Sequence, residues 1–107
     1  MMTNEQANEL FREYRKTGDK NIRNKLVENY MYIAEILAKK FAGRGVEYDD
    51  LLQVASEALI LGVEKFDPSL GNQFTTYVTP TITGMIKNYF RDYSRSVRLP
   101  RRIYALG

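Results

Sequence analysis

Apolar residues recur every three or four positions along most of the chain, and this spacing constrains it to a helical fold more than any other feature. The first amphipathic run follows Thr3, which forms a capping-box pattern with Gln6, and it stops at Gly18. The second run follows Asp19, a residue type that caps helix starts, and it stops at the glycines of residues 43–45. These patterns predict two helices in the first half of the chain.

Two more helices are predicted in the second half. The third starts around residues 48–50 and ends at residues 67–68, because proline disfavours helical geometry in the residue before it. The fourth covers residues 74 to about 95, where Pro80 either kinks it or marks its first turn, and residues 99–100 end it. We therefore expect an all-α protein, a compact bundle of about four main helices.

The chain has 107 residues and lacks cysteine, histidine and tryptophan. This length favours a single domain over residues 1–107, with an N-terminal helix in residues 1–18 and the core and contact helices in residues 19–107. Without cysteine there is no disulfide or thiolate ligand, and without histidine the commonest general base and metal ligand are missing. We expect a protein that is not an enzyme, with no catalytic residue, metal, cofactor or small-molecule substrate.

No apolar stretch is long enough to cross a membrane. The longest, near residues 58–63, is about a third of the roughly 20 residues that a spanning helix needs. Residues 3–6 are polar, and residues 1–6 contain no apolar signal-peptide segment. We therefore expect a cytoplasmic protein with no membrane partner.

The net charge of +3 hides an uneven distribution. Residues 1–83 carry a net charge of −2, whereas residues 84–107 carry +5. The basic residues of this end begin with four that are spaced four, four and three apart: Lys87, Arg91, Arg95, Arg98, Arg101 and Arg102. A solvated face of like charges would repel itself, so we interpret this row as a surface for nucleic-acid phosphates.

The outer face of the third helix is a second candidate surface. Its residues are three or four apart and include two apolar side chains among polar ones: Asp50, Gln53, Val54, Glu57, Ile60 and Glu64. One interpretation is an ordinary solvated face. Apolar groups framed by polar ones are also typical of a protein–protein contact, which is the functional interpretation.

A third candidate surface is the segment of residues 72–83, where Phe74 and Tyr77 stand among hydroxyl and amide side chains. Either ring is also a candidate core residue. The functional interpretation is a surface on which unpaired bases stack, since aromatic stacking contributes about 1–3 kcal/mol per base and tolerates any sequence.

Dense motifs follow one another from residue 50 to residue 102. They are Asp50-Leu51-Leu52-Gln53, Val63-Glu64-Lys65-Phe66-Asp67-Pro68, Gly71-Asn72-Gln73-Phe74-Thr75-Thr76-Tyr77, Ile86-Lys87, Arg91-Asp92 and Val97-Arg98-Leu99-Pro100-Arg101. Together they resemble region 2 of the bacterial sigma-70 family, and the likeness covers about residues 22–103. Residues 80–92 and 97–102 are most similar to the general-stress and sporulation members, an alternative branch of that family.

This resemblance implies an all-helical promoter-recognition domain for transcription initiation. The third helix would bind the clamp helices of the RNA polymerase β′ subunit through Asp50, Gln53, Val54, Ser56, Glu57 and Ile60. The next segment would help melt the promoter −10 element and hold its non-template strand through Phe66, Asp67, Asn72, Phe74, Thr76 and Tyr77. The fourth helix would read the −10 duplex with Gly84, Lys87, Asn88 and Arg91, and would hold phosphates with Arg95, Arg98, Arg101 and Arg102.

The chain departs from the primary members of the family at the stacking surface. Where they carry a tryptophan pair, this chain has Pro80-Thr81, and an aromatic residue expected at Asn72 is missing. Unpairing and unstacking a base costs a few kcal/mol. A stacking surface with fewer aromatic rings offsets less of this cost, so it should require a better-matched promoter. Alternative members of the family share this departure.

The resemblance also implies an anti-sigma factor as a partner, and it leads us to expect that the other promoter-reading domains, which would follow Gly107, are absent. Two alternatives remain open. One is a protein-interaction module that sequesters an anti-sigma factor or occupies the polymerase clamp without productive promoter binding. The other is a basic helical domain that binds the nucleic-acid backbone without sequence preference, through phosphate contacts alone.

Overall fold

The described chain consists of four α-helices and one short 3₁₀ turn. In order they are α1 (Asn4–Thr17), α2 (Lys20–Phe41), α3 (Tyr48–Lys65), η1 (Pro68–Leu70) and α4 (Phe74–Leu106). The computed structural model describes the backbone of residues 2–43 and 45–106 and the side chains of residues 2–43 and 45–92. Over this backbone no strand is present, and the predicted all-α fold with four main helices is confirmed.

The first two helices begin at the predicted capping residues. The Thr3 hydroxyl accepts a hydrogen bond from the Gln6 N–H, and the Gln6 side chain accepts one from the Thr3 N–H, which completes a capping box. Gly18 ends α1 with a φ of 68°, a left-handed conformation that glycine adopts without strain. The Asp19 carboxylate then accepts a hydrogen bond from the Asn21 N–H and starts α2.

The connection from α3 to α4 is short and internally bonded. The Asp67 carboxylate accepts hydrogen bonds from the N–H of Ser69 at 2.9 Å and from its hydroxyl at 2.7 Å. Gly71 turns the chain with a φ of 84°. These local interactions fix the shape of the turn, and η1 packs against α1.

Pro80 lies inside α4 rather than in its first turn, because the helix already begins at Phe74. The hydroxyls of Thr79 and Thr81, on either side of the proline, each donate to the carbonyl four residues earlier, at 2.7 and 3.3 Å. Of the two predicted roles for Pro80, the first-turn role is therefore wrong.

The prediction that residues 99–100 end the fourth helix is also wrong. The α4 backbone remains helical to Leu106. Proline removes one backbone hydrogen bond, but its fixed φ of about −65° is itself a helical value. Pro100 therefore does not end α4.

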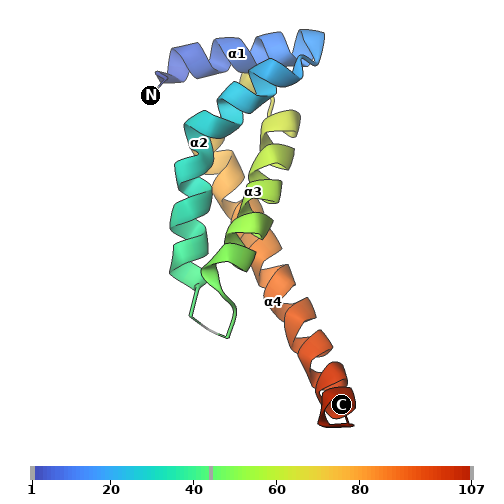
Figure 1. Ribbon diagram of the computed structural model, residues 1–107. Helices are drawn as coiled ribbons and strands as arrows, with labels where there is room; N and C mark the ends of the chain where they lie inside the picture. The colour runs from blue at the N-terminus through green and yellow to red at the C-terminus, as the bar shows by residue number, and fades with distance from the viewer. Residues whose placement is uncertain (1, 44, 107) are drawn as a thin grey trace.

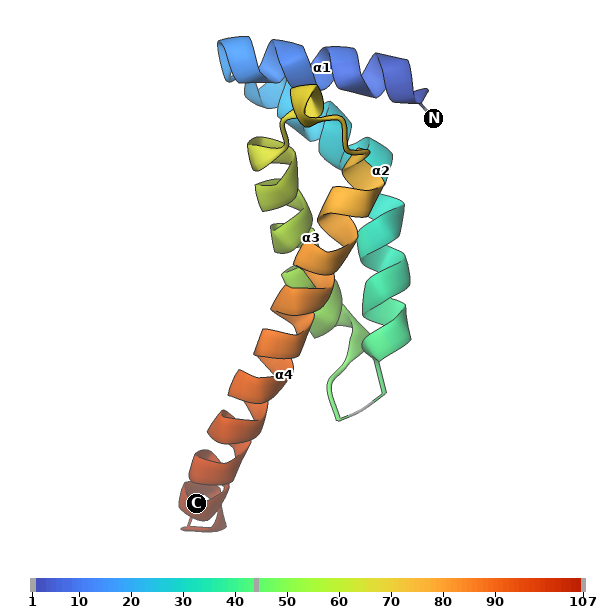
Figure 2. The ribbon, with the colours of Figure 1, turned by 180° about the vertical axis from the view of Figure 1, so that it is seen from behind.

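The helices α2, α3 and α4 pack against one another, and α1 lies across one end of them (Figure 1). The η1 turn lies beneath α1, as the reverse view shows (Figure 2). The C-terminal half of α4 extends beyond the other helices, and the molecule measures 55 × 24 × 22 Å. None of the helices is, over the described residues, long and apolar enough to span a membrane.

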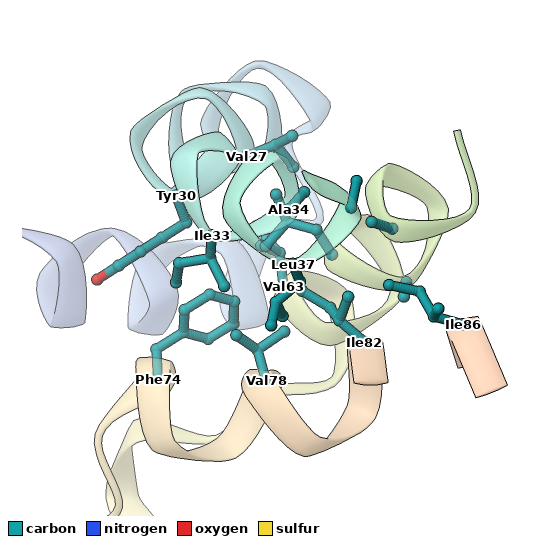
Figure 3. Close-up of a cluster of buried hydrophobic side chains, with 14 of the residues drawn as sticks. Val27, Tyr30, Ile33, Ala34, Leu37, Val63, Phe74, Val78, Ile82 and Ile86 are labelled. Atoms are coloured by element: carbon teal, nitrogen blue, oxygen red, sulfur yellow. The ribbon is translucent and has the colours of Figure 1, made fainter. Parts of the chain in front are cut away.

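The core lies between α2, α3 and α4. The buried side chains that Figure 3 labels come from all three helices: Val27, Tyr30, Ile33, Ala34, Leu37, Val63, Phe74, Val78, Ile82 and Ile86. Gly62 of α3 faces α4 so closely that an added Cβ would lie 2.6 Å from Cγ2 of Val78. A glycine at this position therefore allows α3 and α4 to approach.

Candidate nucleic-acid interface

One face of α4 points away from the core and carries the residues predicted to contact the duplex. All four of these residues are exposed: Gly84, Lys87, Asn88 and Arg91. Thr76, which belongs to the predicted stacking segment, is exposed as well. The fully buried residues Val78, Ile82 and Ile86 lie on the opposite face of the same helix. This periodicity keeps the predicted duplex-contacting residues of the described part of α4 on one accessible face, which we call the α4 outer face.

The cations of the α4 outer face are almost free of internal partners. Among the described residues, Lys87 makes no ion pair, and Arg91 has only a long contact of 4.0 Å with Asp92. The side chains of both Arg91 and Asp92 are more than 60% exposed, so solvent screens this pair strongly. Both positive charges are therefore available to an external anion.

The arginines that continue the basic row are Arg95, Arg98, Arg101 and Arg102. Their backbone belongs to α4, whereas their side chains lie outside the described residues. Of the predicted phosphate-binding side chains, those of Lys87 and Arg91 lie within the described residues.

Gly84 lies on the α4 outer face, where neither packing nor backbone conformation requires a glycine. A Cβ at this position would meet no atom of the described chain within 4 Å, and the φ of Gly84 is not positive. Glycine inside a helix costs about 1 kcal/mol relative to alanine. Unlike Gly62, Gly84 is therefore not explained by packing or by backbone geometry.

Phe66 and Phe74, which were predicted to contact the melted strand, are buried instead, with 2% and 3% of their surface exposed. The ring of Phe11 in α1 packs against them, with centroids 4.8 Å from Phe66 and 5.0 Å from Phe74. The Tyr30 ring lies 4.5 Å from Phe74. The prediction of direct base contact needs correction for these two residues, because α1 covers their rings and makes them core.

Tyr77 is the aromatic residue of the predicted stacking segment that keeps a solvent-accessible surface. It is half-buried, and its ring lies 5.4 Å from that of Phe66. Five residues before Tyr77, the exposed Asn72 lines a pocket of about 180 Å³ together with Asn4, Asn8 and Gln73. The amides of this pocket can donate and accept hydrogen bonds, which is what reading the edge of an unpaired base requires.

Asp67, also predicted to contact DNA, holds the loop in shape. Its carboxylate lies 3.6 Å from Nη2 of Arg15 in α1, and Nη1 of Arg15 donates to the Phe66 carbonyl at 3.4 Å. The hydrogen bonds from Ser69, and secondarily the positive charge of Arg15, lower the pKa of Asp67 below its usual value of 3.8. The carboxylate thus joins Ser69 of η1 to Arg15 of α1 and keeps part of its own surface accessible.

Acid should release this loop. A carboxyl group with a lowered pKa in the folded chain stabilises the fold above its unfolded pKa, and that contribution is lost as the pH falls through the folded value. We expect wild type to lose more unfolding free energy than Asp67→Ala between pH 6 and pH 2. The difference in unfolding free energy between the two proteins should become smaller below about pH 4. Urea unfolding at several pH values measures this, and a difference that is constant with pH would contradict it.

The predicted polymerase-binding residues of α3 separate into two groups. Asp50, Gln53 and Glu57 are exposed. In contrast, Val54 and Ile60 are half-buried and pack against the core, so they are not the exposed apolar residues that the sequence interpretation required. Burial at the two edges of the helix face explains why they are apolar.

Two other residues of α3 are engaged with α2. The Ser56 hydroxyl donates to Sδ of Met31 at 3.6 Å. Glu64 pairs with Arg23 at 3.0 Å, with both side chains partly buried. These contacts join α2 to α3, so Ser56 is only partly available to a partner.

Leu61 is the exposed apolar residue that the sequence interpretation missed. It is 41% exposed and stands four residues after Glu57 on the exposed side of α3. Its position could have been predicted from the sequence, because residues 50, 53, 57 and 61 are three or four apart and therefore share one face of the helix. We call the stripe formed by Asp50, Gln53, Glu57 and Leu61 the α3 outer face. On α2, the described chain exposes two more large apolar residues, Tyr32 and Ile36, at 38% and 59%.

The described chain is a helical domain with a basic, polar outer face on α4 and an acidic, partly apolar outer face on α3. Residues 26–96 match the family model of sigma-70 region 2, and the chain belongs to this family. The resemblance seen in the sequence is thereby confirmed.

Three relatives place the chain near alternative members of the family. It is 40% identical to the RNA polymerase sigma factor SigF of Mycobacterium tuberculosis over 84 residues. This aligned region covers 78% of this chain and 32% of SigF. It is 34% identical over 106 residues to the sigma-B factor of Bacillus subtilis, covering 99% and 40%. It is 34% identical over 103 residues to the sigma-G factor of the same organism, covering 96% and 39%. The chain thus spans about a third to two-fifths of the length of these relatives.

Proposed function

We propose that this chain is the promoter-recognition domain of an alternative RNA polymerase sigma factor. It binds −10 promoter DNA through α4 and the preceding loop, and it binds the polymerase core through α3. The observation that carries the proposal is the α4 outer face, where Lys87, Asn88 and Arg91 are exposed opposite the buried face of the helix. Sequence similarity to three RNA polymerase sigma factors supports it.

The α4 outer face has the chemistry for a DNA duplex. Lys87 and Arg91 neutralise phosphates, and an arginine fork also fits the two acceptors of guanine. The Asn88 amide can donate to and accept from adenine in the same groove. The combination of two cations and an amide on one helix face favours reading a sequence over holding a backbone alone.

The loop before α4 is suited to an unpaired strand. Tyr77 offers a ring for stacking, and Asn72 and its neighbouring amides offer hydrogen bonds to a base edge. Phe66 and Phe74 act beneath this surface, because their buried rings hold Tyr77 and the loop in place. This arrangement supports melting of a matched promoter with fewer stacking rings than the primary members use.

The α3 outer face is proposed to dock on the clamp helices of the polymerase β′ subunit. Its exposed polar residues are followed by an accessible leucine at the end of the stripe, and apolar groups beside polar ones are typical of a protein contact. The chain itself performs no catalysis in this proposal, since the polymerase core supplies it. An anti-sigma factor is the further partner that the family membership suggests, and the site of action is the cytoplasm.

Removing the cations of α4 tests the DNA contact. The probe is a duplex selected from a random pool by the wild-type chain in the presence of polymerase core. We expect Lys87→Ala and Arg91→Ala each to lower affinity for it about tenfold and to reduce the slope of log affinity against log salt by about one. Fluorescence anisotropy at several salt concentrations measures both quantities.

Lys39→Ala is the matched control, because it removes the same charge from an exposed position on α2. It should leave the affinity and the salt slope almost unchanged. Equal losses in all three variants would indicate attraction by net charge alone, and the sequence-reading proposal would then be rejected in favour of non-specific backbone binding.

One observation favours the alternative of an interaction module without productive promoter binding. Phe66 and Phe74 are buried, and Pro80-Thr81 stands where primary members carry tryptophans, so few rings remain for stacking. A chain that binds polymerase core but enriches no sequence from the random pool would establish this alternative.

A further inference from the structure

We propose that Gly84 is the point where α4 approaches the DNA duplex most closely, and that its missing side chain serves this contact. The inference rests on the proposed function, in which the α4 outer face binds DNA. It adds that a position with no side chain sets how deeply the helix enters the groove. Gly84 would thus determine the fit between helix and duplex without making a side-chain contact.

Two glycines, Gly62 and Gly84, lie inside helices of the described chain. Gly62 is required by the fold, because an added Cβ would lie 2.6 Å from Cγ2 of Val78. Gly84 has no such reason: a Cβ would meet nothing of the described chain within 4 Å, and the backbone does not need a positive φ. Alanine would therefore fit at position 84 and would favour the helix more than glycine does.

The surroundings of Gly84 indicate what approaches it. Lys87 and Arg91 follow on the same face, one and two turns later, and both are exposed. Cations on this face attract an anionic partner. Thr76 and Pro80 precede Gly84 on that face, are also exposed and carry no charge that would oppose such a partner.

Dimensions explain why one side chain matters. A helix with its side chains is about 10–12 Å across, and the major groove of DNA is about 12 Å wide. The helix therefore fills the groove. The side chains on the face that points toward the bases limit how far the helix can enter. A glycine there brings the helix backbone closer to the bases and lets Lys87 and Asn88, within the next turn, reach the base edges.

The test uses Gly84→Ala and Gly84→Leu, with Gly62→Ala as the matched glycine control. Gly84→Ala should raise the unfolding temperature by about 2–8 °C, whereas Gly62→Ala should lower it. With polymerase core present, affinity for the selected duplex should fall about fivefold for Gly84→Ala and further for Gly84→Leu. Affinity for polymerase core without DNA should stay unchanged for both Gly84 variants, because α3 is not altered.

The outcomes distinguish this inference from the proposed function. Duplex affinity that is unchanged or increased in Gly84→Ala overturns the inference, while a loss in Lys87→Ala and Arg91→Ala still supports the proposed function. A lower unfolding temperature in Gly84→Ala also overturns it, since the glycine would then serve the fold. If the wild-type chain with core binds no duplex, both the proposed function and the inference fail.

Discussion

Phe11→Ala is expected to lower the free energy of unfolding by about 3–5 kcal/mol, as truncation of a fully buried phenylalanine does. The Phe11 ring has no exposed surface and packs on Phe66 and Phe74 at 4.8 and 5.0 Å. A small domain has only about 5–15 kcal/mol of stability in total, so this single change should remove a large fraction of it. Urea denaturation followed by circular dichroism measures the loss.

The consequence of Phe11→Ala reaches beyond stability. Phe11 is the α1 residue that covers the rings beneath Tyr77, so a cavity at its position loosens the surface proposed to hold the single strand. Leu10→Ala is the matched control on the same helix, because Leu10 is only half-buried. A similar small loss in both variants would show that α1 is not anchored through Phe11.

Local signals in the sequence predicted the helix starts well. Thr3 with Gln6, and Asp19, act through bonds to residues two or three positions away, so neighbours in the sequence are sufficient to identify them. Gly18 likewise ends α1 through its own backbone conformation. The end of α4 was missed because Pro100 was interpreted as a helix terminator, although its fixed φ is compatible with the helix that continues to Leu106.

The candidate sites were harder to predict, because burial depends on which helices meet. The spacing of Phe66 continues the apolar stripe of α3, so its base contact rests on the resemblance alone, and Phe74 is also a candidate core residue. The rings of Phe11, Phe66 and Phe74 pack together in the core. Val54 and Ile60 fall on the outward side by spacing alone, but the neighbouring helices bury the edges of α3. The exposure of the α4 outer face follows more directly from the sequence, since a helix packed on one side exposes the residues opposite its buried stripe.

Leu61→Asp is expected to lower affinity for polymerase core about 10–30-fold, the size of effect that the loss of a buried apolar contact has in an interface. Leu61 is 41% exposed, so a carboxylate there remains hydrated in the free chain and should leave the unfolding temperature almost unchanged. In the proposed complex the same carboxylate would replace the apolar residue at the end of the α3 outer face, one turn after Glu57, where the partner desolvates it and Glu57 repels it. Titration of labelled polymerase core with each variant measures the affinity.

Two comparisons make the Leu61→Asp result specific to the α3 outer face. Ile36→Asp introduces the same charge at an exposed apolar position of α2, where the side chain is 59% exposed, and it should leave core affinity unchanged. Ile60→Asp places the charge against the core, so its main effect should be a lower unfolding temperature. If Leu61→Asp and Ile36→Asp reduced core affinity equally, added negative charge would account for the loss. If neither did, α3 would not be the docking helix and the polymerase contact would have to lie elsewhere on the domain.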